Sequence, residues 1–297
     1  MRIAEFFEFS RTRHQIYLDR AAGKPAPWTS DPILSSFRFT NIYRELDRTT
    51  IWYRENIREP MCAVGARCTL EDILLATIAF RWFNRIETGE ILLGHMPDGS
   101  VHTNLFLDWS SEFARNRLKD RSPVVTAAYI IKTPDGKNKL DGVLWCIDQC
   151  AADIGRLRTE MQNNLKPTLE HAWKVLCAMP YMGPFMAYEV ITDLRFTPIL
   201  ERSPDINSWA NPGPGARRGL SRLQGEDKDF HRSTKSAKLQ ELMQEILWKS
   251  RLSENWPKDW PRWEMREVEH TLCEFDKYER ARTGEGRPKQ RFTSAGK

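Results

Sequence analysis

The sequence predicts a mainly α-helical protein that carries one small β-hairpin insert. Apolar residues recur at helical spacing on both sides of the turn at Met182-Gly183-Pro184, over residues 168–181 and 185–194. One stretch has a different pattern, in which β-branched residues run to Ile131 and the turn-forming Pro134-Asp135-Gly136 follows. This stretch predicts the hairpin, or an extended insert, within an otherwise helical chain.

The N-terminal part of the chain is expected to form helices joined by a connector. Residues 3–22 have the spacing of an amphipathic helix with many arginines. The three prolines within residues 23–32 favour an extended chain. Residues 33–59 are typical of a helix-rich unit with a basic face.

Thr69 predicts the start of a helix over residues 70–83, because Asp72 lies three residues further on and an apolar run follows. The basic, polar residues 282–297 are expected to form a disordered tail. We expect a single catalytic domain over residues 1–281. Further helices are predicted over residues 104–119, 141–161, 235–250 and 262–281.

The composition is that of an intracellular protein with a sizeable core. Hydrophobic residues make up 40% of the 297 residues, and the net charge of +5 is compatible with nucleic acid without being diagnostic. The six cysteines are scattered without a CxxC pair, which is typical of reduced thiols. The N-terminus does not resemble a signal peptide, and no apolar run is long enough to span a membrane.

The turn at Met182, Gly183, Pro184 and Phe185 is a candidate DNA-binding hairpin. Glycine adopts backbone conformations that other residues resist, and proline suits the first helical position. The second helix would then present free backbone N–H groups to a phosphate. The alternative is an ordinary pair of antiparallel helices.

A glycine- and arginine-rich loop is expected at residues 211–219. Gly213 and Gly215 would let backbone N–H groups approach an oxyanion, and Arg217 and Arg218 would supply fork-shaped donors for phosphate. The alternative is a solvated surface turn. The sequence contains no P-loop, which argues against a kinase with its own nucleotide-binding fold.

Polar residues near both ends of the chain are further candidates. If residues 37–48 form a helix, Asn41, Arg44, Asp47 and Arg48 share one polar side. The alternative is a solvated face with intrahelical ion pairs. Asn84 lies beside arginines in FRWFNRI, and His270 and Lys277 lie in EHTLCEFDKYER. No metal site is predicted, since two metal-capable groups are weak support for one.

Several of these segments, taken in order, resemble one family. The segments are PAPWTSDPIL with FRFTNIYRELDR, FRWFNRIETGE, TAAYIIKTPDGKNK, MGPFMAYEVITDL, GPGARRGL and EHTLCEFDKYER. They are similar to successive blocks of the 5-hydroxymethyl-deoxyuridine DNA kinase helical-domain family. This family is also called the α-glutamyl/putrescinyl thymine pyrophosphorylase group. The resemblance covers roughly residues 10–281.

The resemblance implies a helix-hairpin-helix DNA glycosylase-like fold and a role in phage DNA hypermodification. It implies that the substrate is double-stranded DNA in which 5-hydroxymethyluracil has been pyrophosphorylated. An amine, often from an amino acid, would displace the pyrophosphate inside the phage-infected cell. A base must leave the helical stack to be modified in a pocket.

The resemblance also implies roles for individual residues. An acid that follows the hairpin is functional in glycosylases of this fold, so Asp205 is the expected general base, with Asp47 and Glu189 as reserves. The residues expected to bind the pyrophosphate are Arg217, Arg218, Gly213, Gly215, Arg44 and Arg48. A divalent cation such as Mg²⁺ could assist the departure of pyrophosphate, although no dedicated metal motif is visible.

Two other functions are compatible with the sequence. One is a DNA glycosylase that removes a modified uracil, which would release a free base. The other is a DNA-binding module without catalytic activity, in which substitutions of the acids and arginines would change binding alone.

Overall fold

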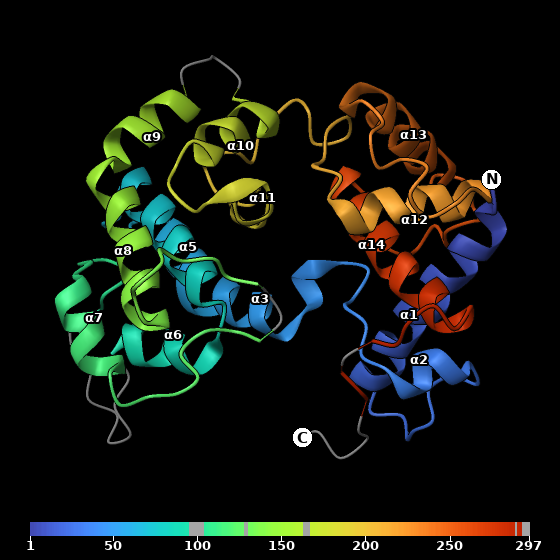
Figure 1. Cartoon of the computed structure of the whole chain (residues 1–297), viewed down its shortest axis with the longest axis horizontal. Helices are drawn as coiled ribbons and strands as arrows, with labels where there is room; N and C mark the ends of the chain where they lie inside the picture. The colour runs from blue at the N-terminus through green and yellow to red at the C-terminus, as the bar shows by residue number, and fades with distance from the viewer. Residues whose placement is uncertain (95–103, 128–129, 163–166, 289, 293–297) are drawn as a thin grey trace. The chain divides into compact units, whose positions relative to one another are not determined.

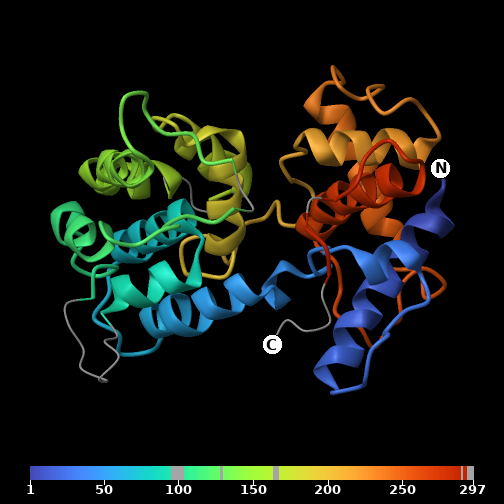
Figure 2. The ribbon, with the colours of Figure 1, turned by 60° about the horizontal axis from the view of Figure 1, so that its bottom comes forward.

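The computed structural model describes residues 1–94, 104–127, 130–162, 167–288 and 290–292. These residues are mainly helical, as the sequence predicts, and form no β-strand; they contain one isolated β-bridge between Phe37 and Arg291. Two compact units are present, shown in Figures 1 and 2. Unit 1 comprises residues 1–47 and 206–297, and unit 2 comprises residues 48–205.

Unit 2 is built around one buried helix, α5 (Leu70–Phe83). Thr69 begins this helix with the predicted capping box, in which Thr69 and Asp72 bond each other's backbone N–H groups. Nearly every residue from Ile73 to Phe83 is buried. Helix α5 packs mainly against α8 (Lys139–Ala152), α9 (Ile154–Met161) and α11 (Gly183–Leu194). The remaining helical segments of unit 2 are α3 (Arg48–Tyr53), η2 (Arg54–Arg58), α4 (Glu59–Cys62), α6 (Ile86–Leu93), α7 (Ser111–Leu118), α8 (Lys139–Ala152), α9 (Ile154–Met161), α10 (Leu169–Cys177) and α11 (Gly183–Leu194).

Unit 1 is built from both ends of the chain around α14 (Met265–Arg282), which packs against α1, α2, α12 and α13. Phe6 of α1 contacts the rings of Trp263 and Phe275, with centroid distances of 6.1 and 5.4 Å. These rings join the first helix to the last in one core. The other helical segments of unit 1 are α1 (Ile3–Ala21), α2 (Pro32–Ser36), η1 (Arg44–Leu46), α12 (Pro214–Gln224) and α13 (Ser236–Lys249).

Helices α12 and α14 lie side by side in unit 1, as Figure 1 shows. A side chain at Gly219 would collide with the backbone of Leu272, and one at Gly215 would collide with the Cys273 side chain. The two glycines therefore allow the helix backbones to approach closely. The prediction of a loop throughout residues 211–219 was wrong, because α12 begins at Pro214.

The predicted β-hairpin is not formed by the described residues of its segment. The turn at Asp135-Gly136 is present, with a φ of 76° at Gly136, but no strand flanks it. The extended chain instead packs on α8, where Thr133 covers Gly142 and Lys139 Nζ donates to the carbonyl of Ile131 at 2.8 Å. Tertiary packing of the extended chain on this helix replaces strand pairing.

Some predicted helices are shorter or interrupted. Residues 37–43 are not helical, α7 covers only part of residues 104–119, and the helix expected over residues 141–161 is divided into α8 and α9 at Asp153. The single catalytic domain expected over residues 1–281 stays a prediction.

Part of the C-terminal tail lies against the N-terminal segment. Arg38 donates its N–H to the carbonyl of Gln290 at 3.1 Å, and Phe292 donates to the carbonyl of Ser36 at 2.9 Å. The Arg20 guanidinium also lies 5.5 Å from the ring centre of Phe292. The disorder expected over residues 282–297 stays a prediction, and residues 293–297 lie outside the described part of the chain.

Candidate functional site

The hairpin between α10 and α11 turns at the residues that the sequence indicated. Gly183 has a φ of +59° with open space where a side chain would stand, and Tyr181 has a φ of 60°. The side chains of Tyr181 and Phe185 are 45% and 50% exposed, whereas Met182 is buried. Trp173 Nε1 donates to the carbonyl of Pro184 at 3.0 Å and ties the two helices together. Among the predicted DNA-binding residues, Phe185 is exposed for contact and Met182 anchors the turn.

Asp205 lies at the N-terminus of α10. Its Oδ1 accepts the backbone N–H of Leu169 at 2.8 Å, and its Oδ2 accepts that of Glu170 at 3.0 Å. Thr168 caps the same helix through the N–H of His171 at 3.1 Å. The positive end of the helix therefore stabilises the Asp205 carboxylate.

Three of the four polar residues predicted to share a helix face, Asn41, Arg44 and Asp47, are brought together by a different structure. Asp47 Oδ1 accepts both the backbone N–H and the Nδ2 of Asn41 at 2.9 Å, and Asp47 Oδ2 lies 2.6 Å from Arg44 Nε. Arg13 Nη2 donates to Asn41 Oδ1 at 2.8 Å. Burial lowers the pKa of Arg13, and the charge of Asp47 opposes this shift. Arg48 is exposed and lies at the start of α3.

Lys277 belongs to the same part of unit 1. Its Nζ lies 2.7 Å from Glu274 Oε2 and 4.6 Å from the ring centre of Phe39. Glu274 Oε2 also accepts the backbone N–H of Thr40 at 3.0 Å, next to Asn41. The segments FRFTNIYRELDR and EHTLCEFDKYER, which the sequence singled out separately, therefore contact each other in unit 1.

Three further candidates are buried. Glu189 lies within α11, and His270 lies within α14 with its Nε2 3.7 Å from Glu269 Oε2. Asn84 ends α5 with a φ of 44°, and its Oδ1 accepts Arg81 Nη1 at 3.0 Å. Arg81 also forms a buried ion pair with Asp193 of α11. Asn84 thus belongs to a buried polar cluster of unit 2.

The two adjacent arginines of α12 have different surroundings. Arg217 donates Nη1 to the carbonyls of His231 and Thr234, at 3.1 and 2.9 Å, and Nε to the carbonyl of Pro212. Arg218 donates Nε to Asp276 Oδ2 at 2.8 Å. Arg217 therefore holds the chain after α12 in place, whereas Arg218 joins a network on α14.

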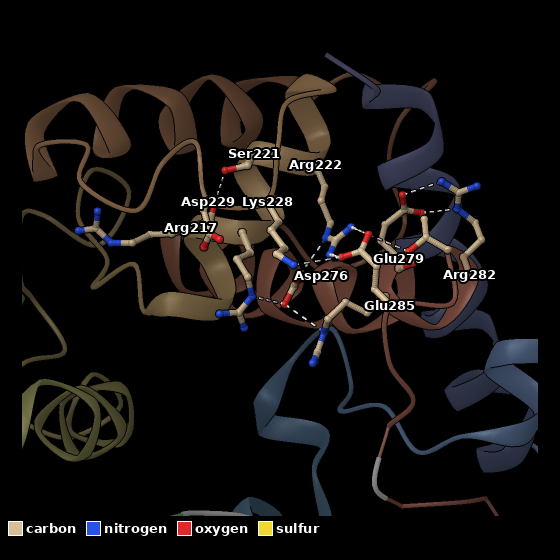
Figure 3. A network of polar contacts seen from close by, with 12 residues as sticks. Arg217, Ser221, Arg222, Lys228, Asp229, Asp276, Glu279, Arg282 and Glu285 are labelled. Atoms are coloured by element: carbon tan, nitrogen blue, oxygen red, sulfur yellow. Dashed lines mark hydrogen bonds and ion pairs between the residues drawn. The ribbon is translucent and has the colours of Figure 1, made fainter.

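This network is centred on Asp276, whose side chain is 1% exposed (Figure 3). Arg222 donates Nε to Asp276 Oδ1 at 2.9 Å and its two terminal nitrogens to Glu285 at 3.0 and 2.8 Å. Arg222 lowers the pKa of Glu285 to about 2, since the hydrogen-bonded guanidinium favours the ionised carboxylate. Figure 3 shows Arg217 pointing away from Asp276.

The two glycines of the predicted anion-binding segment have structural surroundings. Gly213 is the residue before α12, and its N–H donates to Glu269 Oε1 at 3.3 Å. Gly215 faces Cys273 of α14. Both glycines serve the packing of α12 in this structure.

Sequence reasoning missed Arg13, Arg222, Arg280 and Glu285, and it grouped Asp276 with Lys277 without giving it a role. Asp276 and Arg280 are one helical turn apart, and this spacing predicts an ion pair between them. It does not predict that arginines of α12 also bind Asp276. Within the described ranges, no group of three metal-ligating side chains is present. No described helix is long and apolar enough to cross a membrane.

Comparison with known proteins gives two matches. A protein family described as "5-hmdU DNA kinase, helical domain" matches residues 2–287. A protein of Bacillus phage SP10 named 5-hmdU DNA kinase is 30% identical over 221 residues. That similarity covers 67% of this chain and 32% of the relative, so the chain spans about a third of the relative's length. No solved structure matches the chain.

Proposed function

Because the chain belongs to the 5-hmdU DNA kinase helical-domain family, we propose that it is a transferase that modifies thymine-derived bases in DNA. Its substrate is double-stranded DNA that carries 5-(pyrophosphoryloxymethyl)uracil, and its co-substrate is an amine, most simply an amino acid. The observation that carries this proposal is the family match over residues 2–287.

The reaction forms one bond and breaks one. The neutral amine attacks the exocyclic methylene carbon, a C–N bond forms, and the C–O bond to pyrophosphate breaks. Pyrophosphate leaves with the electron pair, and the amine nitrogen loses a proton to a base. The protein must therefore accept a proton and stabilise the negative charge of the leaving group.

Asp205 is the proposed base. Its carboxylate follows the hairpin and is held at the N-terminus of α10 by two backbone N–H groups. Asp47 and Glu189 are the reserve candidates, but Asn41 and Arg44 already engage Asp47, and Glu189 is buried. Asp205 is preferred to both because it follows the hairpin, where the family resemblance places the functional acid.

Arg218 is the first proposed contact of the pyrophosphate, followed by Arg44 and Arg48. Arg217 is the weakest of the predicted arginines, because backbone carbonyls occupy its Nε and Nη1. Arg48 is exposed, and Arg44 is joined to Asp47 through Nε. A divalent cation such as Mg²⁺ would add to this charge stabilisation.

The α10–α11 hairpin is the proposed DNA-binding element of a helix-hairpin-helix, glycosylase-like architecture. The left-handed backbone conformation of Gly183 and the exposed side chain of Phe185 at the turn support this proposal. The N–H groups that begin α11 would contact backbone phosphates, and the target base would leave the stack.

Pyrophosphate release tests the proposed reaction. Pyrophosphorylated DNA is incubated with the protein and with each amino acid in turn, and free pyrophosphate is measured. We expect release that depends on the amine. Release of a free base without an amine would instead identify a DNA glycosylase, and DNA binding without either product would identify a binding module.

A further inference from the structure

Three arginines of unit 1 meet one buried carboxylate, and all three approach it through Nε. Arg218 and Arg222 of α12 lie 2.8 and 2.9 Å from Asp276, and Arg280 of α14 lies 3.5 Å away. An arginine that is bound through Nε keeps its two terminal nitrogens, which carry four N–H donors. The carboxylate therefore orients Arg218 and Arg222 through hydrogen bonds and Arg280 through an ion pair.

The three forks differ in what they contact. Glu285 accepts both terminal nitrogens of Arg222, so this guanidinium is fully engaged. Among the described residues, none accepts a hydrogen bond from the terminal nitrogens of Arg218 or Arg280. The side chains of Arg218 and Arg280 are 33% and 39% exposed, so solvent and ligands reach them.

Positive charge exceeds negative charge in this network. In the described part of the chain, the ion pairs of this network join four cations to two carboxylates, Asp276 and Glu285, which leaves two positive charges unbalanced. The four cations are Arg218, Arg222, Arg280 and Lys228. The excess lies beside the two available forks, because Arg222 is matched by Glu285. An anion is therefore the ligand that this arrangement favours.

We infer that Arg218 and Arg280, positioned by Asp276, form a clamp for a phosphate group. A planar guanidinium fork matches the spacing of two phosphate oxygens, and two forks held by one carboxylate lose little conformational freedom on binding. The inference deepens the proposed function and rests on it for the choice of phosphate. The phosphate belongs either to the pyrophosphoryl group of the substrate or to the DNA backbone.

The test uses Arg218→Ala, Arg280→Ala and Arg280→Lys in the full chain. Arg282→Ala is the matched control, because Arg282 lies on the same helix but Glu279 already accepts its Nε and Nη2 at 2.7 and 2.8 Å. The dissociation constants of inorganic pyrophosphate and of unmodified duplex DNA are measured at several salt concentrations. Thermal melting checks that each variant is folded.

For either source of phosphate, both alanine variants weaken binding roughly 10- to 100-fold, the range for hydrogen bonds between charged groups. Arg280→Lys recovers only part of this loss, because lysine lacks the fork. If pyrophosphate binding falls and duplex binding does not, the clamp holds the leaving group. If duplex binding falls and the salt slope drops by about one, the clamp holds a backbone phosphate.

Unchanged binding of both ligands in folded Arg218→Ala and Arg280→Ala would overturn the clamp, as would an equal loss in Arg282→Ala. These outcomes are separate from a failure of the proposed reaction. The wild-type protein can bind pyrophosphate through the clamp without transferring an amine, which would refute the transferase and leave the clamp in place. If both alanine variants transfer the amine at the wild-type rate and bind both ligands normally, the clamp is refuted and the transferase stands.

Discussion

At the scale of single residues, Asp205 has both a structural and a proposed chemical role. The sequence places this acid after the hairpin, and the family resemblance makes it the expected general base. The structure shows that Asp205 caps the N-terminus of α10, which lies earlier in the chain. This contact between residues about 36 apart could not be predicted from local sequence, because the helix already has its own cap at Thr168.

Substitution of Asp205 separates the two roles. Asparagine has one acceptor oxygen in place of two, so Asp205→Asn should lose one backbone contact and about 0.5–2 kcal/mol of stability. If Asp205 is the base, the rate of amine transfer should also fall about 10²–10⁴-fold at neutral pH and recover in part at high pH. Urea unfolding and initial rates across pH measure the two effects.

Thr168→Ala is the control, because it removes a cap from the same helix without removing a carboxylate. It should lose similar stability and keep its activity. Full activity of folded Asp205→Asn at pH 7 would exclude Asp205 as the base and direct the search to Asp47 and Glu189.

His14 makes the stability of unit 1 depend on pH. Its ring is buried against Tyr43, Trp256 and Trp260. Burial first, and then the charge of Arg13, lower the pKa of His14 from 6.5 to about 4. The folded protein thus disfavours the protonated ring, so this contribution to stability is complete above pH 6.5 and is lost as the pH falls toward 4.

We expect the wild-type protein to lose about 1–2 kcal/mol more stability than His14→Phe between pH 7 and pH 5. Phenylalanine keeps an aromatic ring at this position but cannot be protonated. Urea midpoints at the two pH values measure the difference. Equal losses in the two proteins would show that His14 does not titrate in this range.

Gly183 fixes the turn of the proposed DNA-binding hairpin. Because its φ is +59° and no atom lies within 4 Å of the position that a Cβ would take, a substitution strains the backbone without a collision. Gly183→Val should cost about 1–2 kcal/mol at this turn and weaken the binding of all duplex sequences. Gly183→Asn should bind more tightly than Gly183→Val, since asparagine tolerates this conformation. Fluorescence anisotropy with two unrelated duplexes gives the affinities, and unchanged affinity in folded Gly183→Val would count against the hairpin as a DNA contact.

At the scale of helices, capping residues and hydrophobic spacing predicted a helix correctly only where residues within the helix itself determine its start and length. The helix after Thr69 was predicted correctly because its capping box lies within four residues. Residues 37–43 and the chain before Asp135 were mispredicted, because their conformation follows from contacts with other elements. The glycines and arginines of residues 213–219 suggested an anion-binding loop, whereas two of these glycines allow α12 to pack on α14.

The close approach of α12 and α14 predicts unequal effects of alanine at two helical glycines. Gly219→Ala should destabilise the protein, by roughly 1–3 kcal/mol, because its methyl group meets the backbone of Leu272. Gly155→Ala in α9 should stabilise it by about 0.5–1 kcal/mol, since no atom lies near that position and alanine favours a helix. Thermal melting measures both, and a stable Gly219→Ala protein would argue against the close approach.

At the scale of the whole molecule, the sequence predicted helical content and family membership better than the arrangement of units. Unit 1 joins residues 1–47 to residues 206–297, and its core pairs Phe6 with Trp263 and Phe275. Hydrophobic spacing gives the face of each helix but not its distant partner. The same limit applies to the Asp276 network, whose arginines come from two helices that are far apart in the chain.

Mass spectrometry of nucleosides is the decisive test of amine transfer. DNA carrying 5-(pyrophosphoryloxymethyl)uracil is incubated with the full chain and individual amino acids, digested to nucleosides and compared with a sample that lacks the protein. We expect the pyrophosphorylated nucleoside to be replaced by one whose mass equals the 5-methylene nucleoside joined through nitrogen to the amino acid. An unchanged nucleoside profile with every amino acid and amine tested, or loss of the modified base as a free base, would contradict the proposed transferase.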